Sequence, residues 1–109
     1  MASLSTHVLD TARGAPATGI DVALWHLGAH PRELGRGMTD VDGRIAISLA
    51  GSLSRGVYEL RFFVRSYFDG LHTPSFYDEI PVRFSIVEDT HYHVPLLLSP
   101  FGYSTYRGS

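Results

Sequence analysis

The sequence predicts an all-β protein, a sandwich or barrel built from short antiparallel strands. Apolar and polar residues alternate with a period of two, most clearly in residues 57–65, where the even positions are apolar and the odd positions carry Glu59, Arg61 and Arg65. Short alternating segments separated by turns are typical of such folds. The turn signals, rich in Gly, Pro, Asp and Ser, lie at residues 13–16, 28–31, 40–43 and 51–56.

Seven strands and one short helix are expected from this pattern. The segment 66–72, followed by Thr73 and Pro74, breaks the alternation and is expected to form one or two helical turns that the proline ends. No repeat, linker or low-complexity stretch divides the chain, so residues 1–109 are expected to form one domain. The expected strands span residues 4–10, 20–27, 44–49, 57–65, 82–86, 91–98 and 102–107.

Composition excludes several classes of protein. The net charge is −2 and acidic and basic residues are interleaved, so the chain lacks the basic stripe of a nucleic-acid-binding protein. It has no cysteine, which excludes disulfides, thiolate nucleophiles and cysteine metal sites. It shows neither a signal-peptide pattern nor a run approaching the ~20 apolar residues of a membrane-spanning helix. A soluble cytoplasmic protein without membrane or nucleic-acid partners is therefore expected.

Two histidines two residues apart are the first candidates for chemistry. His91 and His93 should point to the same side of their strand, and such a pair is a common half of a zinc site. His7 is the obvious third ligand, so a zinc hydrolase is one reading of these residues. No carboxylate lies nearby at ligand spacing, and an isolated pair is more often an ordinary feature of a strand surface. The residues alone leave both readings open.

Three further features carry polar groups. His7 lies on the polar side of its strand, whereas Asp10 falls on the opposite side and is a poor partner for orienting it. Arg44 stands at the entry of its strand, on the polar side. Residues 106–109, a tyrosine, an arginine, a glycine and a serine, are expected to complete a site. The sequence carries no nucleophile elbow, phosphate-binding glycine loop or dinucleotide fingerprint.

Taken together, five segments resemble the 5-hydroxyisourate hydrolases, transthyretin-related enzymes of urate breakdown. The segments occur in the family's order and span nearly the whole chain, and five motifs in register are far more specific than any one of them. They are residues 4–20 (LSTHVLDTARGAPATGI), 39–44 (TDVDGR), 76–80 (FYDEI), 91–100 (HYHVPLLLSP) and 106–109 (YRGS).

The resemblance implies a fold and an assembly. The fold would be a transthyretin-like sandwich of two antiparallel sheets with about eight strands and one short helix. The protein would form a homotetramer, a dimer of dimers, with active sites in a channel between the dimers. Polar side chains on outward strand faces would then line a site.

The resemblance also implies a reaction: hydrolysis of the six-membered-ring amide of 5-hydroxyisourate, giving 2-oxo-4-hydroxy-4-carboxy-5-ureidoimidazoline, without metal or cofactor. The catalytic residues would be His7, Arg44 and His93. A neutral histidine can take a proton from the attacking water, and arginine can stabilise developing negative charge. His7 is slightly favoured as the base. The substrate would be bound by His7, Arg44, Tyr106 and Ser109.

Two other functions are carried as alternatives. Transthyretin shares the fold and carries thyroid hormone in the same channel, but proteins of that kind lack the set formed by the histidines, the arginine and the YRGS segment. A sandwich of this size could also be a non-catalytic binding module, because a fold does not fix a function.

Overall fold

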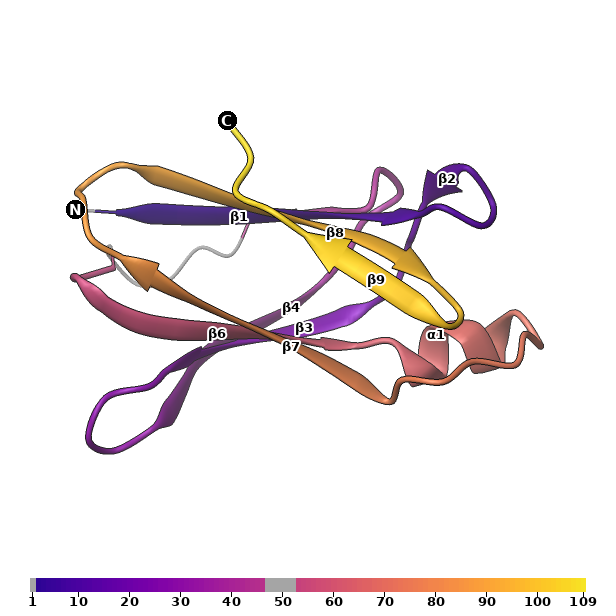
Figure 1. Ribbon diagram of the computed structural model, residues 1–109, viewed down its shortest axis with the longest axis horizontal. Coiled ribbons are helices and arrows are strands. Elements are labelled where there is room, and N and C mark those ends of the chain that lie inside the picture. The colour runs from indigo at the N-terminus through magenta and orange to yellow at the C-terminus, as the bar shows by residue number, and fades with distance from the viewer. Residues whose placement is uncertain (1, 47–52) are drawn as a thin grey trace.

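The computed structural model describes residues 2–46 and 53–109. The strands form two sheets packed face to face, and one short helix lies at one end of the sandwich (Figure 1). In chain order the elements are β1 (Ser3–Asp10), β2 (Ala15–Pro16), β3 (Asp21–His26), β4 (Arg32–Met38), β5 (Arg44–Ala46), β6 (Gly56–Phe63), α1 (Arg65–Gly70), β7 (Glu79–Ile86), β8 (His91–Ser99) and β9 (Gly102–Thr105).

One sheet has the order β2-β1-β8-β9, with β5 also pairing β1, and the other has the order β4-β3-β6-β7. Every neighbouring pair is antiparallel except β1 and β8, which run parallel. The predicted two-sheet sandwich with one short helix is confirmed. The described residues form nine strands, of which β2 is only two residues long.

All seven expected strands are present, with small shifts at their ends. β6 ends at Phe63, because α1 begins at Arg65, one residue before the expected helix. β7 begins at Glu79, three residues before the expected strand. β5 covers the first half of the strand expected at 44–49. Residues 47–49, together with the start of the turn expected at 51–56, lie outside the described residues.

β4 was not predicted from the sequence, and its composition explains why. The strand carries two glycines, three charged residues and no alternation, and most of its side chains are exposed at a sheet edge. Packing favours glycine at position 37, since a Cβ there would meet the end of the Ile45 side chain on the facing sheet, which would have to move. The close approach of β4 and β5 therefore selects a residue that weakens the strand signal.

The core lies between the sheets, and period-two alternation decides which side chains enter it. Along β1 and β8 the inward side chains are buried, and burying each large apolar one stabilises the fold by about 1.5–3 kcal/mol. The inward residues are Leu4, Thr6, Val8 and Asp10 on β1, and Tyr92, Val94, Leu96 and Leu98 on β8. Ser3, Ser5, His7, His91 and His93 therefore lie on the outer face of this sheet.

Asp10 is a structural residue inside the sandwich. Its carboxylate is almost fully buried and accepts the backbone N–H groups of Ala12 and Arg13, both at 3.1 Å. The hydroxyl of Tyr67 donates to it at 2.8 Å. Burial and this hydrogen bond raise the pKa of Tyr67. Asp10 thus fixes the turn after β1, and it faces away from His7 as the sequence predicted.

Within the described residues, no helix is long and apolar enough to cross a membrane.

Candidate functional site

The predicted site residues of β1, β5 and β8 meet on the outer face of one sheet. β1 lies between the other two strands: His7 pairs with Arg44 of β5, and Ser5 pairs with His93 of β8. Directly opposed residues in antiparallel strands have their Cβ atoms about 4.5–5.5 Å apart. His7 and Ser5 are two residues apart and point to the same side. The register therefore gathers His7, Arg44 and His93 on one surface.

The turn before β5 positions Arg44. Its Asp40 carboxylate accepts the backbone N–H of Asp42 at 2.9 Å and that of Arg44 at 3.0 Å. Gly43 adopts a positive φ of 72°, a conformation that glycine reaches without steric cost. Its carbonyl accepts the N–H of Val8 at 2.7 Å. The DVDGR sequence therefore ties the turn to β1 and sets Arg44 beside His7.

The same turn fixes the tautomer of His7. Nε2 of His7 lies 2.9 Å from the carbonyl oxygen of Asp42. A carbonyl can only accept, so Nε2 carries the proton and donates it. In the neutral ring the lone pair is then on Nδ1, which can take a proton from a water molecule.

His93 is held by Ser5 and kept neutral. Its Nδ1 lies 2.8 Å from the Ser5 hydroxyl. Burial is the main cause that lowers the pKa of His93 below its ordinary value. Electrostatic interactions with Arg44, His7 and His91 lower the pKa further. Because the ordinary value is about 6.5, the imidazole of His93 is uncharged at neutral pH and available as a base.

His91 and Ser5 belong to the same cluster, although the sequence did not place them in the site. The Ser5 hydroxyl also lies 2.8 Å from Nε2 of His91, and Nδ1 of His91 lies 2.6 Å from the Ser3 hydroxyl. His91 and His93 do share one side of β8, as predicted. The sequence signal for Ser5 was its position two residues before His7, but its role depends on the pairing of β1 with β8.

Residues 106–109 approach His93 from beyond β9. The backbone N–H of Gly108 donates to the carbonyl of His93 at 2.8 Å. A Cβ on Gly108 would stand 2.6 Å from Cδ2 of His93, so the segment can pass here only because position 108 has no side chain. Beyond β9 the chain rises above the outer face of the β1–β8 sheet (Figure 1). Tyr106 is 57% exposed, and Ser109, the residue after Gly108, is exposed as well.

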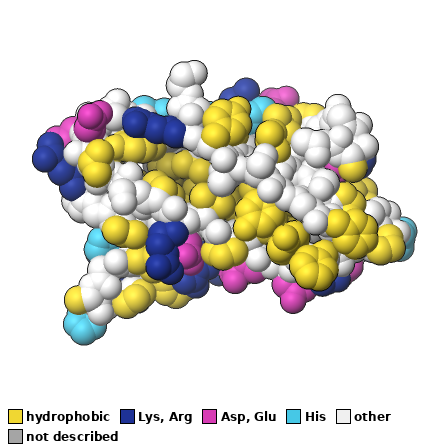
Figure 2. Space-filling model, viewed as in Figure 1, with side chains coloured by type: hydrophobic (Ala, Val, Ile, Leu, Met, Phe, Trp, Pro, Cys, Tyr) yellow, Lys and Arg dark blue, Asp and Glu magenta, His cyan; other side chains and the backbone are white. Residues whose placement is uncertain are grey.

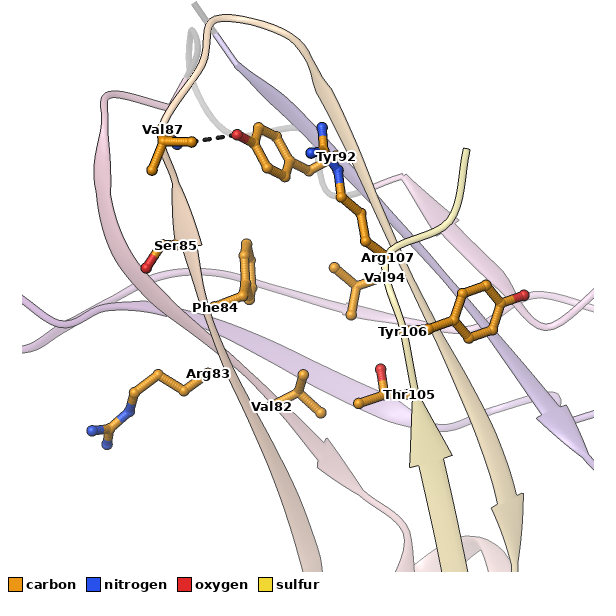
Figure 3. Close-up of a pocket in the computed structure, with 10 residues that line it drawn as sticks. All are labelled: Val82, Arg83, Phe84, Ser85, Val87, Tyr92, Val94, Thr105, Tyr106 and Arg107. Carbon is orange, nitrogen blue, oxygen red and sulfur yellow. Dashed lines mark hydrogen bonds between the residues drawn. The ribbon is translucent and has the colours of Figure 1, made fainter.

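Arg107 lies on the other side of β8, away from the histidines. Its guanidinium carbon is 4.2 Å from the centre of the Tyr92 ring, a cation–π contact, and Tyr92 in turn accepts the N–H of Val87 at 3.0 Å (Figure 3). Within the segment 106–109, Gly108 therefore contacts one predicted catalytic residue, His93. Arg107 packs on Tyr92 instead, and Tyr106 and Ser109 lie before and after these two residues.

A pocket of about 280 Å³ opens between β7 and β9, at the edge where the two sheets separate. Its lining is mostly apolar, with Val82, Phe84 and Val94 pointing into it, whereas Tyr106 points away (Figure 3). Figure 2 shows hydrophobic side chains gathered along this edge. The pocket lies on the inner side of β8 and contains none of His7, Arg44 and His93. Of the predicted site residues, only Tyr106 belongs to its lining.

The arrangement does not assemble a metal centre. Among the described residues, no three His, Asp or Glu side chains come together in a way that could hold a metal ion. The two ring nitrogens of His91 are both occupied by serine hydroxyls. The face does offer the imidazoles of His7 and His93 and the guanidinium of Arg44, a set suited to moving a proton and stabilising an oxyanion.

Comparison with known proteins shows the family of the chain. Residues 4–108 match the family model described as the HIUase/Transthyretin family. A 5-hydroxyisourate hydrolase of Mesorhizobium japonicum is 51% identical over 97% of this chain and 91% of its own. The structure of Klebsiella pneumoniae 5-hydroxyisourate hydrolase superposes with a TM-score of 0.91 at 39% identity, covering both chains completely. Sea bream transthyretin in complex with thyroxine also superposes with a TM-score of 0.91, at 27% identity over 97% of this chain and 94% of its own. The chain belongs to the HIUase/Transthyretin family.

Proposed function

We propose that this protein hydrolyses 5-hydroxyisourate to 2-oxo-4-hydroxy-4-carboxy-5-ureidoimidazoline, a step of urate breakdown. The relatives named as 5-hydroxyisourate hydrolases support this substrate, since they match the chain at up to 51% identity. The observation that carries the proposal is the meeting of His7, Arg44 and His93 on one sheet face. Three separate strands supply these groups, and together they meet the needs of an amide hydrolysis.

The reaction begins with an attack of water on the ring carbonyl. Nδ1 of His7 is the preferred base, because the hydrogen bond from Nε2 to the Asp42 carbonyl leaves its lone pair on Nδ1. Arg44, paired with His7 across the strands, stabilises the negative charge that develops on the carbonyl oxygen. His93, neutral and on the same face, takes part in the proton transfers that open the ring. No step calls for a metal or a cofactor.

Tyr106 and Ser109 bind the substrate in this proposal, together with His7 and Arg44. Their place on either side of Gly108, which contacts His93, supports that role. The site is open on the single chain, and we infer that it is closed by other copies in a homotetramer, a dimer of dimers. The proposal places this transthyretin-like domain, residues 1–109, in the cytoplasm.

The competing function is that of a small-molecule carrier. Overall shape does not separate the two, because the hydrolase of Klebsiella pneumoniae and sea bream transthyretin superpose equally well. Sequence identity does favour the enzyme, at 39% against 27%. The His7, Arg44 and His93 cluster points the same way, because a carrier needs no neutral imidazole beside an arginine.

Turnover separates an enzyme from a carrier. The substrate is generated in situ by urate oxidase, and its ultraviolet decay is followed with the protein present at a small fraction of its concentration. An enzyme accelerates the decay of the entire substrate pool above the buffer rate. Arg44→Ala is expected to reduce this acceleration, whereas the control Ser66→Ala, a change on the exposed side of α1, is expected to leave it unchanged. A carrier would bind at most one equivalent of substrate, so the rest of the pool would decay at the buffer rate. That result would overturn the proposal.

A further inference from the structure

Four side chains on the outer sheet face form an unbroken hydrogen-bonded chain. It runs from Nδ1 of His93 to the Ser5 hydroxyl at 2.8 Å, from there to Nε2 of His91 at 2.8 Å, and from Nδ1 of His91 to the Ser3 hydroxyl at 2.6 Å. His93 is partly buried, whereas His91 and Ser3 are exposed. The chain thus connects a site residue with solvent.

Each member of this chain can both donate and accept. A serine hydroxyl donates one proton and accepts others, and a neutral imidazole donates from one nitrogen and accepts at the other. The chain therefore has two consistent directions. In the first, Nδ1–H of His93 donates to Ser5, Ser5 to Nε2 of His91, and Nδ1–H of His91 to Ser3. In the second, all three hydrogen bonds are reversed.

We propose that Ser5 and His91 form a proton relay that carries a proton from His93 to solvent through Ser3. When a proton arrives at Nε2 of His93, the proton on Nδ1 of that ring moves to Ser5, and the Ser5 proton moves to Nε2 of His91. The proton on Nδ1 of His91 then moves to Ser3, and the Ser3 proton passes to water. The first direction is converted into the second, and one proton leaves the site. The inference rests on the proposed function.

The chemistry of the proposed reaction supplies a proton to export. Opening the ring amide yields a carboxyl group and a ureido nitrogen. The carboxyl group ionises at neutral pH, its pKa being about 3–4, and a ureido nitrogen is not basic enough to take the released proton. One proton per turnover must therefore reach solvent.

The surroundings of His93 oppose keeping that proton on its ring. The charged and titratable groups facing it are Arg44 from β5, His7 from β1 and His91 from β8, and each opposes a positive charge on His93. On another side, position 108 lies so close that a Cβ there would stand 2.6 Å from Cδ2 of His93 and 3.3 Å from Cγ of Pro95. The backbone of the 106–109 segment thus covers part of the ring, and the serine–histidine chain offers the proton another way out.

Substitution of Ser5 tests the relay. Ser5→Ala breaks the chain between the two histidines and is expected to lower kcat at least tenfold in dilute, non-transferring buffer, since a positioned proton-transfer group contributes about 10²–10⁴-fold. Added imidazole, a mobile proton carrier, should restore most of the loss. Ser5→Thr keeps the hydroxyl and should behave like the wild type, as should the control Ser66→Ala.

His91→Gln separates a relay from simple positioning. Glutamine can still hydrogen-bond to Ser5 through its amide, but it cannot pass a proton from one end to the other by changing tautomer. The relay predicts slow turnover that imidazole restores. Wild-type turnover by His91→Gln in dilute buffer would overturn the relay, because Ser5 would then only orient His93. A loss that imidazole cannot restore in either variant would overturn it as well.

Failure of the relay is distinguishable from failure of the proposed function. If the wild-type protein does not accelerate the decay of 5-hydroxyisourate, the proposed function is wrong and the relay falls with it. If the wild type turns over but Ser5→Ala and His91→Gln match it at every buffer concentration, only the relay is wrong. Circular dichroism of each variant verifies that the sandwich is folded.

Discussion

Gly108 and His93 are in direct contact: the Gly108 N–H donates to the His93 carbonyl at 2.8 Å, and Cδ2 of His93 lies 2.6 Å from where a Cβ on Gly108 would be. The contact joins the segment after β9 to the beginning of β8. It sets Gly108 against His93, a predicted catalytic residue, and explains in steric terms why a glycine stands between Arg107 and Ser109.

Gly108→Ala is expected to impair catalysis more than stability. The new methyl group must push aside either the His93 ring or the 106–109 segment, and a misplacement of about 1 Å in a site can cost 10²-fold in rate. The measurement is kcat together with the thermal unfolding midpoint. Gly102→Ala is the matched control, because a Cβ there meets only the Ser99 hydroxyl at 3.6 Å. Equal turnover by both variants would show that the contact is not functional.

The lowered pKa of His93 predicts how activity and stability depend on pH. If neutral His93 is required, its protonation lowers kcat/KM only below the ordinary histidine value of about 6.5. The unfolded chain binds a proton at that value and the folded chain only at a lower one, so the unfolded state holds more protons between the two. The free energy of unfolding should therefore fall as the pH drops through this window. Urea unfolding of the wild type and His93→Gln checks it, and an equal pH dependence in both would contradict the assignment.

Asp10 should matter for stability rather than for chemistry. Asp10→Ala removes the acceptor of the Ala12 and Arg13 N–H groups and of the Tyr67 hydroxyl, and a hydrogen bond to a charged group contributes about 1.5–3 kcal/mol. Denaturant unfolding should report the loss, with Asp10→Asn milder because it keeps one carbonyl oxygen. Turnover per folded molecule should remain near the wild-type value at low temperature. A stable but inactive Asp10→Ala would instead place Asp10 in the catalytic machinery.

Exhaustive chelation should leave turnover unchanged. The histidine nitrogens that a zinc ion would need are engaged: Nε2 of His7 donates to a carbonyl, and both nitrogens of His91 bond to serines. The measurement is kcat after dialysis against EDTA, with and without added zinc. Activity lost on dialysis and restored by zinc would revive the metal-site reading of His91 and His93.

Much of the fold could be predicted because period-two alternation is a local signal. Tyr92, Val94 and Leu96 read as a buried side of a strand from their spacing alone. β4 could not be predicted, since Gly37 is selected by its contact with Ile45 on the other sheet and not by its own neighbours in sequence. The packing of β4 against the other sheet thus favours a glycine, and this glycine weakens the alternation from which strands are predicted.

The site was predictable in its parts but not in its connections. His7, Arg44 and His93 were identified through the family resemblance, and the strand spacing placed His7 and Arg44 on polar sides. That β1 and β8 pair in parallel, with Ser5 beside His93, is a long-range fact that no local pattern encodes. Ser5 was missed for this reason, whereas His91 was considered as a zinc ligand but left out of the catalytic set. Arg107 could not be assigned to a side of β8 before the end of β9 was known.

The most direct test of the account is the ultraviolet decay of 5-hydroxyisourate, generated in situ by urate oxidase, with wild-type protein, His7→Ala and buffer alone. We expect the wild type to accelerate the decay above the spontaneous rate, and His7→Ala to lose about 10²–10⁴-fold of that acceleration while keeping its fold and oligomeric state. A folded His7→Ala protein with wild-type turnover would contradict the assignment of His7 as the base. A folded wild-type assembly with no acceleration at all would contradict the enzyme itself.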